Sequence, residues 1–422
     1  MAKTESAYIH MKTIGIIAEF NPFHNGHLHL IEYCRKELHA DYIVVVMSGD
    51  FVQRGTPAFV CKFARTKMAL SCGADLVLEL PVYYSTGSAE FFASGAVALL
   101  NKLGCVDQLV FGSECGDIEV LDLIANILVE EPGQFKDVLS EHVKKGDSYP
   151  VARQKALLSY ITESDLPINE LCEIEGFLSS PNNILGIEYI KALKATNSSI
   201  MPVTIKRIGE SYNSANINSL ASASGIRKYI CEEGLKKDSL RDSMPGSCLD
   251  LLIENSDRFA DMKRYSDLVY YKLLVEKENG YTRYLDVNND LSNKIVSNLE
   301  KYENFDQFCL LLKSKDIAYS RICRSLTHIL LNITADNMNE YKSDQFTSYI
   351  RVLGMRLYSS ALVKRINASC GGKAITNIKN AEKELTELEY QLFKETIMAT
   401  EIYNSICPKK NPNEYRLKQI II

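Results

Sequence analysis

The sequence predicts an α/β fold, with a Rossmann-like, doubly wound parallel sheet in the first part of the chain and a mostly α-helical C-terminal domain after it. Short, nearly continuous apolar runs alternate with helical patterns up to about residue 238, as parallel strands covered by helices on both faces do. Beyond that point strand-like runs nearly vanish and amphipathic helical patterns take over. A length of 422 residues also suggests two domains, at roughly 100 to 200 residues each. We therefore expect domains over residues 11–238 and 239–422.

Each predicted element follows from its local pattern. Apolar runs of strand length cover residues 13–19, 42–47, 75–80, 108–111 and 202–208. Helices are expected over residues 27–38, 58–71, 89–102, 118–129, 151–161 and 184–195, with another beginning near Ser222. In the second domain the spacing of apolar residues predicts helices over 305–313, 319–331 and 382–403.

Composition excludes several classes of protein. Hydrophobic residues make up 46% and charged residues 24%, which is typical of a globular chain and excludes a disordered one. The 48 Lys and Arg against 53 Asp and Glu give a net charge of −5, so a nucleic-acid surface would have to be local. The 12 cysteines form no C-x-x-C pair, which favours reduced thiols in a cytoplasmic protein. No apolar run reaches bilayer length, and residues 1–10, ahead of a possible second start at Met11, are expected to have no structural role.

One stretch carries the chemistry: residues 15–30, GIIAEFNPFHNGHLHL, which predict a strand, a tight loop and the start of a helix. Asn25 is expected to be the N-cap, and Gly26 to leave room for a phosphate near the backbone. The helix N-terminus would supply free N–H groups and the positive end of its dipole. His24 and His27 flank the same point and could donate to a phosphate under attack.

Two other interpretations of the histidine pair stay open at this stage. An H-x-x-H pattern by itself usually means two surface histidines. Zinc binding would need further ligands, and no Cys or His cluster at metal spacing accompanies the pair, so no protein-bound metal is predicted. The position of the pair, in the first strand-to-helix turn of a parallel sheet, favours a nucleotide site.

His24-Asn25-Gly26-His27 resembles the H-x-G-H signature of the nucleotidyltransferase and class I aminoacyl-tRNA-synthetase-like superfamily. More narrowly, the chain resembles the tRNA(Met) cytidine acetate ligase family through blocks that occur in the same order. These blocks are EFNPFHNGH (19–27), VMSG (46–49), QRG (53–55), ARTKMAL (64–70), ELP (79–81), FGSE (111–114), SPNNILG (180–186) and, in the helical part, YIRVLGM (349–355).

This resemblance implies a reaction. Acetate and ATP would form acetyl adenylate and pyrophosphate, and the acetyl group would pass to the exocyclic amine of the wobble cytidine in elongator tRNA(Met), giving N4-acetylcytidine. Acetyl-CoA would not be needed, and Mg²⁺ is expected with ATP from phosphate chemistry. A small-molecule nucleotidyltransferase of the same superfamily is the alternative, and a nucleotide-sensing or RNA-binding module that has lost catalysis is another. The sequence contains no signal for an oligomeric state.

The resemblance also implies site residues. His24 and His27 would be catalytic. ATP would be bound by Ile17, Ala18, Glu19, Phe20, Asn21, Pro22, Phe23, His24, Asn25, Gly26, His27, Leu28, His29, Leu30, Gly112, Asn182, Arg207, Ser224 and Arg227. Turn and N-cap roles remain open for Gly112 and Asn182, as does a plain capped helix for residues 222–228, where Ser222 is a further candidate. Two interpretations stay open for Lys62, Arg65 and Lys67: they could bind phosphates, or they could only form a solvent-exposed helix face.

The tRNA-binding surface is expected in the helical domain. Its principal candidates are Arg321, Arg324, Lys364 and Arg365. Further basic candidates are His328, Arg351, Arg356, Lys409, Lys410, Arg416 and Lys418. For any one of these residues, the competing interpretation is that its side chain only lies on a solvent-exposed helix face.

Overall fold

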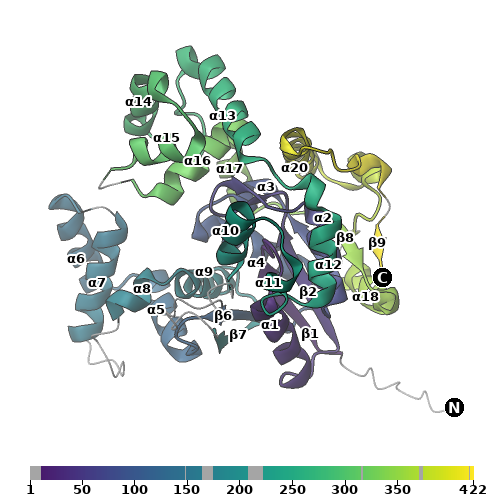
Figure 1. Cartoon of the computed structure of the whole chain (residues 1–422). Coiled ribbons are helices and arrows are strands. Elements are labelled where there is room, and N and C mark those ends of the chain that lie inside the picture. The colour runs from purple at the N-terminus through teal and green to yellow at the C-terminus, as the bar shows by residue number, and fades with distance from the viewer. Residues whose placement is uncertain are drawn as a thin grey trace.

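A seven-stranded sheet lies at the centre of the protein (Figure 1), in the order β7-β6-β1-β2-β5-β8-β9. The structure, a computed structural model, describes residues 11–147, 149–163, 174–207, 222–314, 317–369, 374–417 and 419–422. The strands of the sheet are β1 (Thr13–Ala18), β2 (Tyr42–Ser48), β5 (Leu76–Leu80), β6 (Gln108–Ser113), β7 (Met201–Lys206), β8 (Val352–Met355) and β9 (Ile420–Ile421). A separate hairpin pairs β3 (Phe51–Val52) with β4 (Thr56–Pro57).

The direction of the strands fixes where a ligand can bind. All pairs from β7 to β5 are parallel, whereas β8 runs antiparallel to β5 and parallel to β9. The chain proceeds from β1 to β2 and β5 on one side, and β6 and β7 are added on the other side of β1. The strand order therefore reverses between β1 and β6, and a ligand crevice is expected at the carboxyl ends of these two strands.

Helices cover both faces of the sheet (Figure 1). In the first part of the chain they are α1 (Asn25–Lys36), α2 (Lys62–Ser71), α3 (Val82–Ser85), α4 (Ala89–Leu103), α5 (Ile118–Glu130), α6 (Gly133–Lys144), α7 (Tyr149–Glu163), α8 (Ile174–Ser179), α9 (Pro181–Ala195) and α10 (Ala223–Glu233). Later helices are α11 (Lys237–Leu240), α12 (Gly246–Glu254), α13 (Met262–Glu276), α14 (Asn289–Asn298), α15 (Phe305–Leu312), α16 (Tyr319–Leu331), α17 (Ala335–Ser343), α18 (Ser360–Ser369), α19 (Ala381–Glu384) and α20 (Glu387–Ile406). No helix among the described residues has the length and apolar content to cross a bilayer.

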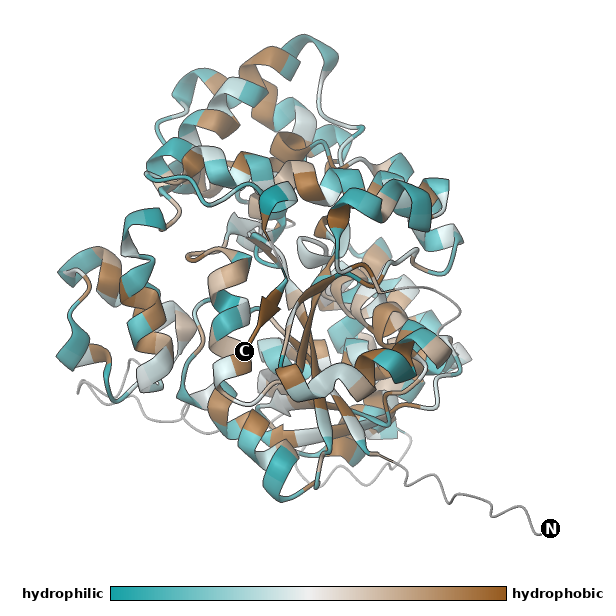
Figure 2. Cartoon of the chain, turned by 90° about the vertical axis from the view of Figure 1, so that its right-hand side faces the viewer, coloured by the Kyte–Doolittle hydropathy of each residue, from teal (hydrophilic) through white to brown (hydrophobic). Residues whose placement is uncertain are grey.

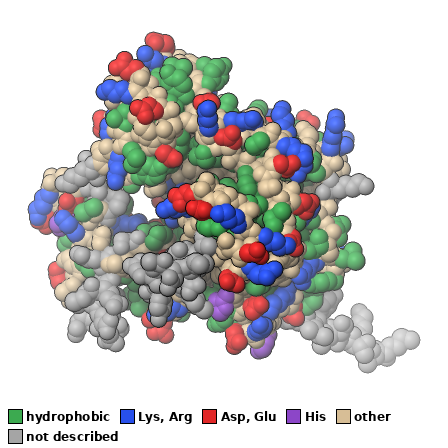
Figure 3. Space-filling model, viewed as in Figure 1, with side chains coloured by type: hydrophobic (Ala, Val, Ile, Leu, Met, Phe, Trp, Pro, Cys, Tyr) green, Lys and Arg blue, Asp and Glu red, His purple; other side chains and the backbone are tan. Residues whose placement is uncertain are grey.

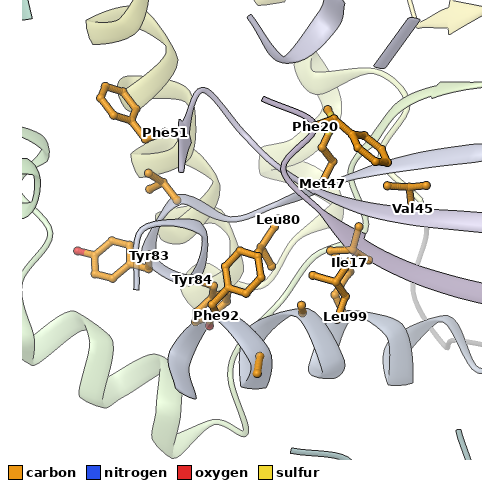
Figure 4. Close-up of a cluster of buried hydrophobic side chains, with 14 of the residues drawn as sticks. Ile17, Phe20, Val45, Met47, Phe51, Leu80, Tyr83, Tyr84, Phe92 and Leu99 are labelled. Atoms are coloured by element: carbon orange, nitrogen blue, oxygen red, sulfur yellow. The ribbon is translucent and has the colours of Figure 1, made fainter. Parts of the chain in front are cut away.

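The core forms where the strands are apolar on both faces. Every residue of β2 and β5 is buried, as expected of parallel strands between two helical layers. In Figure 4 the side chain of Ile17 on β1 faces Leu99 of α4, whereas Met47 of β2 lies near Phe20, on the other face of the sheet. Figure 2 shows mostly hydrophobic strands at the centre of the molecule and helices of mixed hydropathy around them. Burial of these apolar side chains, at about 25 cal/mol per Å², holds the sheet in place beneath the loops at its edge.

The predicted fold class, an α/β sheet followed by a largely helical part, is confirmed, but several elements differ from the prediction. No strand was predicted beyond residue 238, whereas β8 and β9 extend the sheet there. Both are too short to stand out in the sequence, and their partner β5 lies far upstream. The predicted helix over 58–71 begins only at Lys62, because residues 56–57 form β4. The predicted helix over 382–403 is interrupted at Leu385, where Thr386 and Glu389 form a capping box that starts α20. The division at residues 238 and 239 stays a prediction.

Candidate functional site

The two histidines of the loop between β1 and α1 cap the helix themselves. His24 is the N-cap, with its Nδ1 accepting from the Gly26 amide at 3.0 Å, while the His27 Nδ1 accepts from the His24 amide at 3.2 Å. The two ring centroids lie 3.7 Å apart. The prediction that Asn25 is the N-cap is therefore wrong, and the Asn25 side chain donates to the carbonyl of Asp242 at 2.9 Å instead.

This capping box fixes the tautomer of both rings. Because each Nδ1 accepts a hydrogen bond, a neutral imidazole must carry its proton on Nε2. Neither Nε2 has a partner among the described residues, so each ring offers an N–H for a ligand. The helix cap thus orients two donors side by side.

Both rings are held in the neutral form. Burial lowers the pKa of His24 to about 4, with the positive charge of Arg207 adding to the effect. Burial likewise lowers the pKa of His27 well below its usual value, and His24 and Arg207 lower it further. His24 is 4% exposed, so the interpretation of the H-x-x-H pattern as two surface histidines is wrong for this residue. The buried rings of Phe20 and Phe23 pack behind His27, with centroids at 4.9 and 5.4 Å.

The first turn of α1 does not provide the free amides that the sequence predicted. The amide of Asn25 donates to the carbonyl of Ser243 at 3.0 Å, that of Gly26 to His24, and that of His27 to the His24 carbonyl at 2.9 Å. Gly26 also serves a different purpose from the one predicted. A Cβ there would lie 2.8 Å from Cε1 of His24, so glycine makes room for the imidazole. The imidazole N–H groups therefore replace the backbone amides as donors.

The remaining residues of this loop divide into scaffold and surface. Ile17, Phe20, Asn21, Pro22 and Phe23 are buried, whereas Asn25, Gly26 and His29 are exposed and Ala18, Glu19, Leu28 and Leu30 are half-buried. Asn21 accepts from the Phe59 amide at 2.7 Å through Oδ1, and Glu19 accepts from the Gln53 amide at 2.9 Å. Much of the predicted ATP-binding stretch therefore supports the conformation of the loop from the protein interior.

Arg207, Asn182 and Gly112 come together at the ends of β6 and β7. Nη1 of Arg207 lies 3.5 Å from Oδ1 of Asn182, and the Arg207 amide donates to the Ser113 carbonyl at 2.9 Å. A Cβ on Gly112 would lie 3.1 Å from Cγ of Arg207, so this glycine leaves space for the arginine side chain. The charge of Arg207 acts on both histidines, which places these three residues in the neighbourhood of the α1 cap.

Glu114, which the sequence did not single out, connects this group. Its carboxylate accepts from the amides of Asn182 and Asn183 at 3.2 and 2.8 Å. A charged residue directly after a buried strand, inside the FGSE block, was the signal that could have identified it.

Arg227 brings α10 to the same loop. Its Nη1 donates to the Asn21 carbonyl at 2.6 Å and its Nη2 to Oγ of Ser224 at 3.3 Å. Burial lowers the pKa of Arg227, and the nearby Glu19 carboxylate opposes that shift. Ser222 is the N-cap, accepting from the Gly225 amide at 3.1 Å. Within the described part of the chain, the amides of Ala223 and Ser224 have no partner.

The solvated helix face that was one alternative for Lys62 and Arg65 is wrong, because both side chains are paired inside the protein. Both are fully buried. Lys62 pairs with Glu79 at 2.6 Å and with Glu414 at 2.5 Å, and Arg65 donates to the carbonyls of Glu19 and Ser48 at 2.6 and 2.9 Å. Lys67 is exposed.

The basic residues predicted to bind tRNA differ in their surroundings. Arg321 donates to the Asp286 carbonyl at 3.2 Å, and Nε of Arg324 pairs with the Asp286 carboxylate at 3.0 Å. Nη1 of Arg365 donates to the Met11 carbonyl at 2.6 Å, whereas Lys364 is exposed and has no ionic partner among the described residues.

Among the further candidates, His328 is wrong as a tRNA ligand because it is buried between the carbonyls of Leu285 and Thr86. Arg351 is wrong for the same reason, being buried between Glu79 and Glu414. Arg356 donates to the Leu70 carbonyl at 3.0 Å and Lys409 pairs with Asp257 at 2.7 Å. Lys410 and Arg416 are exposed, and Lys418 lies outside the described residues. On the face shown in Figure 3, basic and acidic side chains are interspersed.

No group of three or more His, Cys, Asp or Glu side chains within the described ranges is arranged to hold a metal ion. The arrangement at the sheet edge is therefore one of donors and cations. It can bind and stabilise an anion with several oxygens, such as a polyphosphate, against two neutral imidazoles.

Comparison with known proteins points the same way. The chain matches the HIGH Nucleotidyl Transferase family over residues 11–419. It is 39% identical over 414 residues to a tRNA(Met) cytidine acetate ligase of Clostridium perfringens, covering 97% of this chain and 100% of that protein. It is 40% identical over 408 residues to one of Acetivibrio thermocellus, covering 95% and 96%. The crystal structure of Thermotoga maritima TmcAL bound with alpha-thio ATP matches with a TM-score of 0.88 at 30% identity, over 98% of this chain and 100% of that chain. The apo form of that protein matches with a TM-score of 0.89.

Proposed function

This chain belongs to the HIGH nucleotidyl transferase family and, within it, to the tRNA(Met) cytidine acetate ligases, and on that premise we propose how its residues perform the reaction. It is an ATP-dependent ligase that activates acetate and acetylates a cytidine of tRNA(Met). The observation that carries the proposed site is the pair of neutral imidazoles, each anchored through Nδ1 and open at Nε2.

His24 and His27 bind the α-phosphate of ATP. One carboxylate oxygen of acetate forms a bond to the α-phosphorus while the bond from that phosphorus to the bridging oxygen breaks, so pyrophosphate leaves. Negative charge on the α-phosphate oxygens is stabilised by the two Nε2–H donors, which are oriented before the reaction begins. Neutral rings suit this role, because they donate without needing to gain or lose a proton.

The β- and γ-phosphates bind at the N-terminus of α10. The amides of Ala223 and Ser224, the Ser224 hydroxyl and the Arg227 guanidinium face the same end of that helix, where the dipole favours negative charge. Arg207 lies beside Asn182 at the ends of β6 and β7, and its charge acts on both histidines. ATP therefore lies across the carboxyl ends of β1 and β6, with its reacting phosphate between Arg227 and Arg207.

In the second step the exocyclic amine of the wobble cytidine in elongator tRNA(Met) attacks the acetyl carbonyl. A carbon–nitrogen bond forms, the carbon–oxygen bond to AMP breaks, and the amine loses a proton. N4-acetylcytidine results without acetyl-CoA, since the adenylate supplies the activated acyl group. The proposed location is the cytoplasm, where tRNA is modified.

Mg²⁺ enters with ATP. The described residues hold no cluster of carboxylates or imidazoles that fits a resident ion, and Mg²⁺ commonly keeps several waters while it binds substrate phosphates. It would supply charge neutralisation on the phosphates. We assign no protein ligand to it.

The two predicted domains divide the work. Residues 11–238 form the adenylating part, and residues 239–422 supply much of the tRNA surface. Lys364 is the strongest of the four principal candidates, because Arg321, Arg324 and Arg365 each already bind a protein oxygen.

The test is acetyl transfer with purified components. Labelled acetate, ATP, Mg²⁺ and tRNA(Met), with no CoA, should give N4-acetylcytidine at the wobble position, detected by mass spectrometry of the digested tRNA. A tRNA in which that cytidine is replaced by uridine is the matched control and should remain unlabelled. Acetylation that requires acetyl-CoA would contradict the proposal.

A further inference from the structure

The carboxylate of Glu114 closes the N-terminus of α9. Ser180, the N-cap residue, does not cap the helix with its side chain, because its hydroxyl donates to the Gly176 carbonyl at 2.8 Å. Glu114 takes its place from the end of β6, accepting from the amide of Asn182 at 3.2 Å and from that of Asn183 at 2.8 Å. The negative charge also complements the helix dipole at this end.

Asn183 locks Glu114 in return. Its Oδ1 accepts from the amides of Glu114 and Cys115 at 3.0 and 3.1 Å, and its Nδ2 donates to the Phe177 carbonyl at 3.2 Å. Asn183 is 1% exposed, so this reciprocal clamp is shielded from water. The position of the Glu114 carboxylate is consequently fixed from both sides.

The same carboxylate determines which way the Asn182 amide points. Oε1 of Glu114 accepts from Nδ2 of Asn182 at 2.6 Å, and a carboxylate can only accept. Nδ2 must therefore face Glu114, and Oδ1 must face the other way, where Nη1 of Arg207 lies at 3.5 Å. A flipped amide would place two acceptors against each other on one side and two donors on the other.

We propose that Glu114 is a positioning residue of the ATP site, which turns the Asn182 carbonyl toward the nucleoside so that Oδ1 accepts a hydrogen bond from a donor on it. That donor is a ribose hydroxyl or the exocyclic amine of adenine. The α9 end binds the nucleoside and no phosphate, because its first amides are already neutralised by Glu114. The α10 end, whose first amides have no partner within the described residues, takes the phosphates. This inference rests on the proposed function, since it concerns how ATP lies in the site.

A double-mutant cycle tests the positioning role. Glu114→Gln replaces a group that can only accept with one that can also donate, so the Asn182 amide is no longer held in one orientation. We expect the KM for ATP in acetate-dependent pyrophosphate exchange to rise on the order of 10-fold, while kcat falls much less. In an Asn182→Ala background the same Glu114→Gln change should raise KM by less than about 2-fold, because the group through which it acts is gone.

Asp117→Ala is the matched control. Asp117 also caps a helix with its carboxylate, accepting from the Glu119 and Val120 amides at the start of α5. Its loss should lower the midpoint of urea unfolding yet leave the KM for ATP unchanged. A purely structural role of Glu114 predicts the same pattern for Glu114→Gln, so an unchanged KM there would overturn the proposal. Equal KM effects of Glu114→Gln in both backgrounds would also overturn it.

Analogues of ATP identify the donor. 2′-Deoxy-ATP, 3′-deoxy-ATP and purine riboside triphosphate each lack one candidate group. For the analogue that lacks the donor, Asn182→Ala should no longer change KM, whereas it should still do so for the other two. If Asn182→Ala raises the KM equally for all three analogues, Oδ1 accepts from none of these groups and the proposal fails. Absence of acetate-dependent exchange in the wild type would instead defeat the proposed function, so the two failures are distinguishable.

Discussion

Two clusters of charged and polar side chains lie at different strands of this sheet, and they differ in how completely they are paired. At the edge of β1 and β6, His24 and His27 each have one protein anchor through Nδ1. Between β5 and β8, Glu79 and Glu414 bind both Lys62 and Arg351, and all four side chains are at most 3% exposed. Burial alone would raise the pKa of Glu414, but Arg351 and Lys62 outweigh it and lower that pKa to about 2.

The difference teaches that residue type alone does not distinguish a site from a structural cluster. Lys62, Glu79 and Arg351 lie in or beside sequence blocks as specific as the H-x-G-H motif, yet their donors and acceptors are used within the protein. The histidines retain an unused N–H each. Changes in the cluster of Lys62, Glu79, Arg351 and Glu414 should therefore affect stability, and changes in the histidine pair should affect catalysis.

The largest expected effect is a loss of stability when the fully paired cluster of Lys62, Glu79, Arg351 and Glu414 is disrupted. Arg351→Met leaves Glu79 and Glu414 with only Lys62 as a charged partner, and breaking a buried ion pair typically costs about 3–5 kcal/mol. Urea unfolding should show this loss, whereas pyrophosphate exchange per folded molecule should remain close to that of the wild type. Lys409→Met removes the exposed pair with Asp257 and should change the free energy of unfolding little, because solvent screens such a pair. A similar loss in both variants would contradict the distinction.

The next largest effect is a loss of catalytic rate when His24 or His27 is replaced. His24→Asn keeps an acceptor at the N-cap, and His27→Gln keeps the partner that a capping box needs, but both remove an imidazole N–H. Each should lower the exchange rate by roughly 10²- to 10³-fold with little change in the unfolding midpoint. Near-normal exchange in either variant would show that these rings do not contact the reacting phosphate.

A smaller effect is expected on tRNA binding, where the same comparison of paired and unpaired cations applies. Lys364→Glu should weaken binding and reduce the slope of log K against log salt by about 1 or more, because an unpaired lysine can bind a phosphate. Arg324→Gln should do less, since Arg324 already pairs with Asp286. Filter binding over a salt series measures both. Acetate-dependent exchange is the control, and a fall in exchange with tRNA affinity intact would contradict the division between the two domains.

The smallest effect concerns pH and stability. The pKa of His24 is lowered to about 4 in the folded protein, whereas an unfolded chain has a value near 6.5. Between these values the unfolded state binds more protons, so the contribution of His24 to stability is complete above about pH 6.5 and is lost as the pH falls toward 4. The wild type should lose more unfolding free energy over this interval than His24→Asn does. Parallel losses in the two proteins would show that folding does not lower the pKa of His24.

Local pattern was enough to predict the strands that build the site. The apolar run ending at Ala18 and the Pro/Gly loop after it identify the β1–α1 junction, because strand and turn signals are carried by neighbouring residues. The cap was predicted at Asn25 and not at His24, since imidazoles are uncommon caps and Asn is a preferred one.

Partners distant in sequence could not be predicted in the same way. Nothing near Arg351 indicates that Glu79 will lie against it, and nothing near Glu114 indicates that it will cap α9. These contacts depend on which strands become neighbours in the sheet. β8 could not be predicted for the same reason. Its four residues do not specify a strand by themselves, and the strand depends on antiparallel pairing with β5.

The account depends most on one claim, that the α1 cap with its two imidazoles is the place where acetate is adenylated. ATP–pyrophosphate exchange, measured with and without acetate and in the absence of tRNA and CoA, tests it most directly. We expect exchange that requires acetate in the wild type and that is reduced by roughly 10²-fold or more in His27→Gln. Exchange that proceeds without acetate, or that survives in His27→Gln, would contradict the claim.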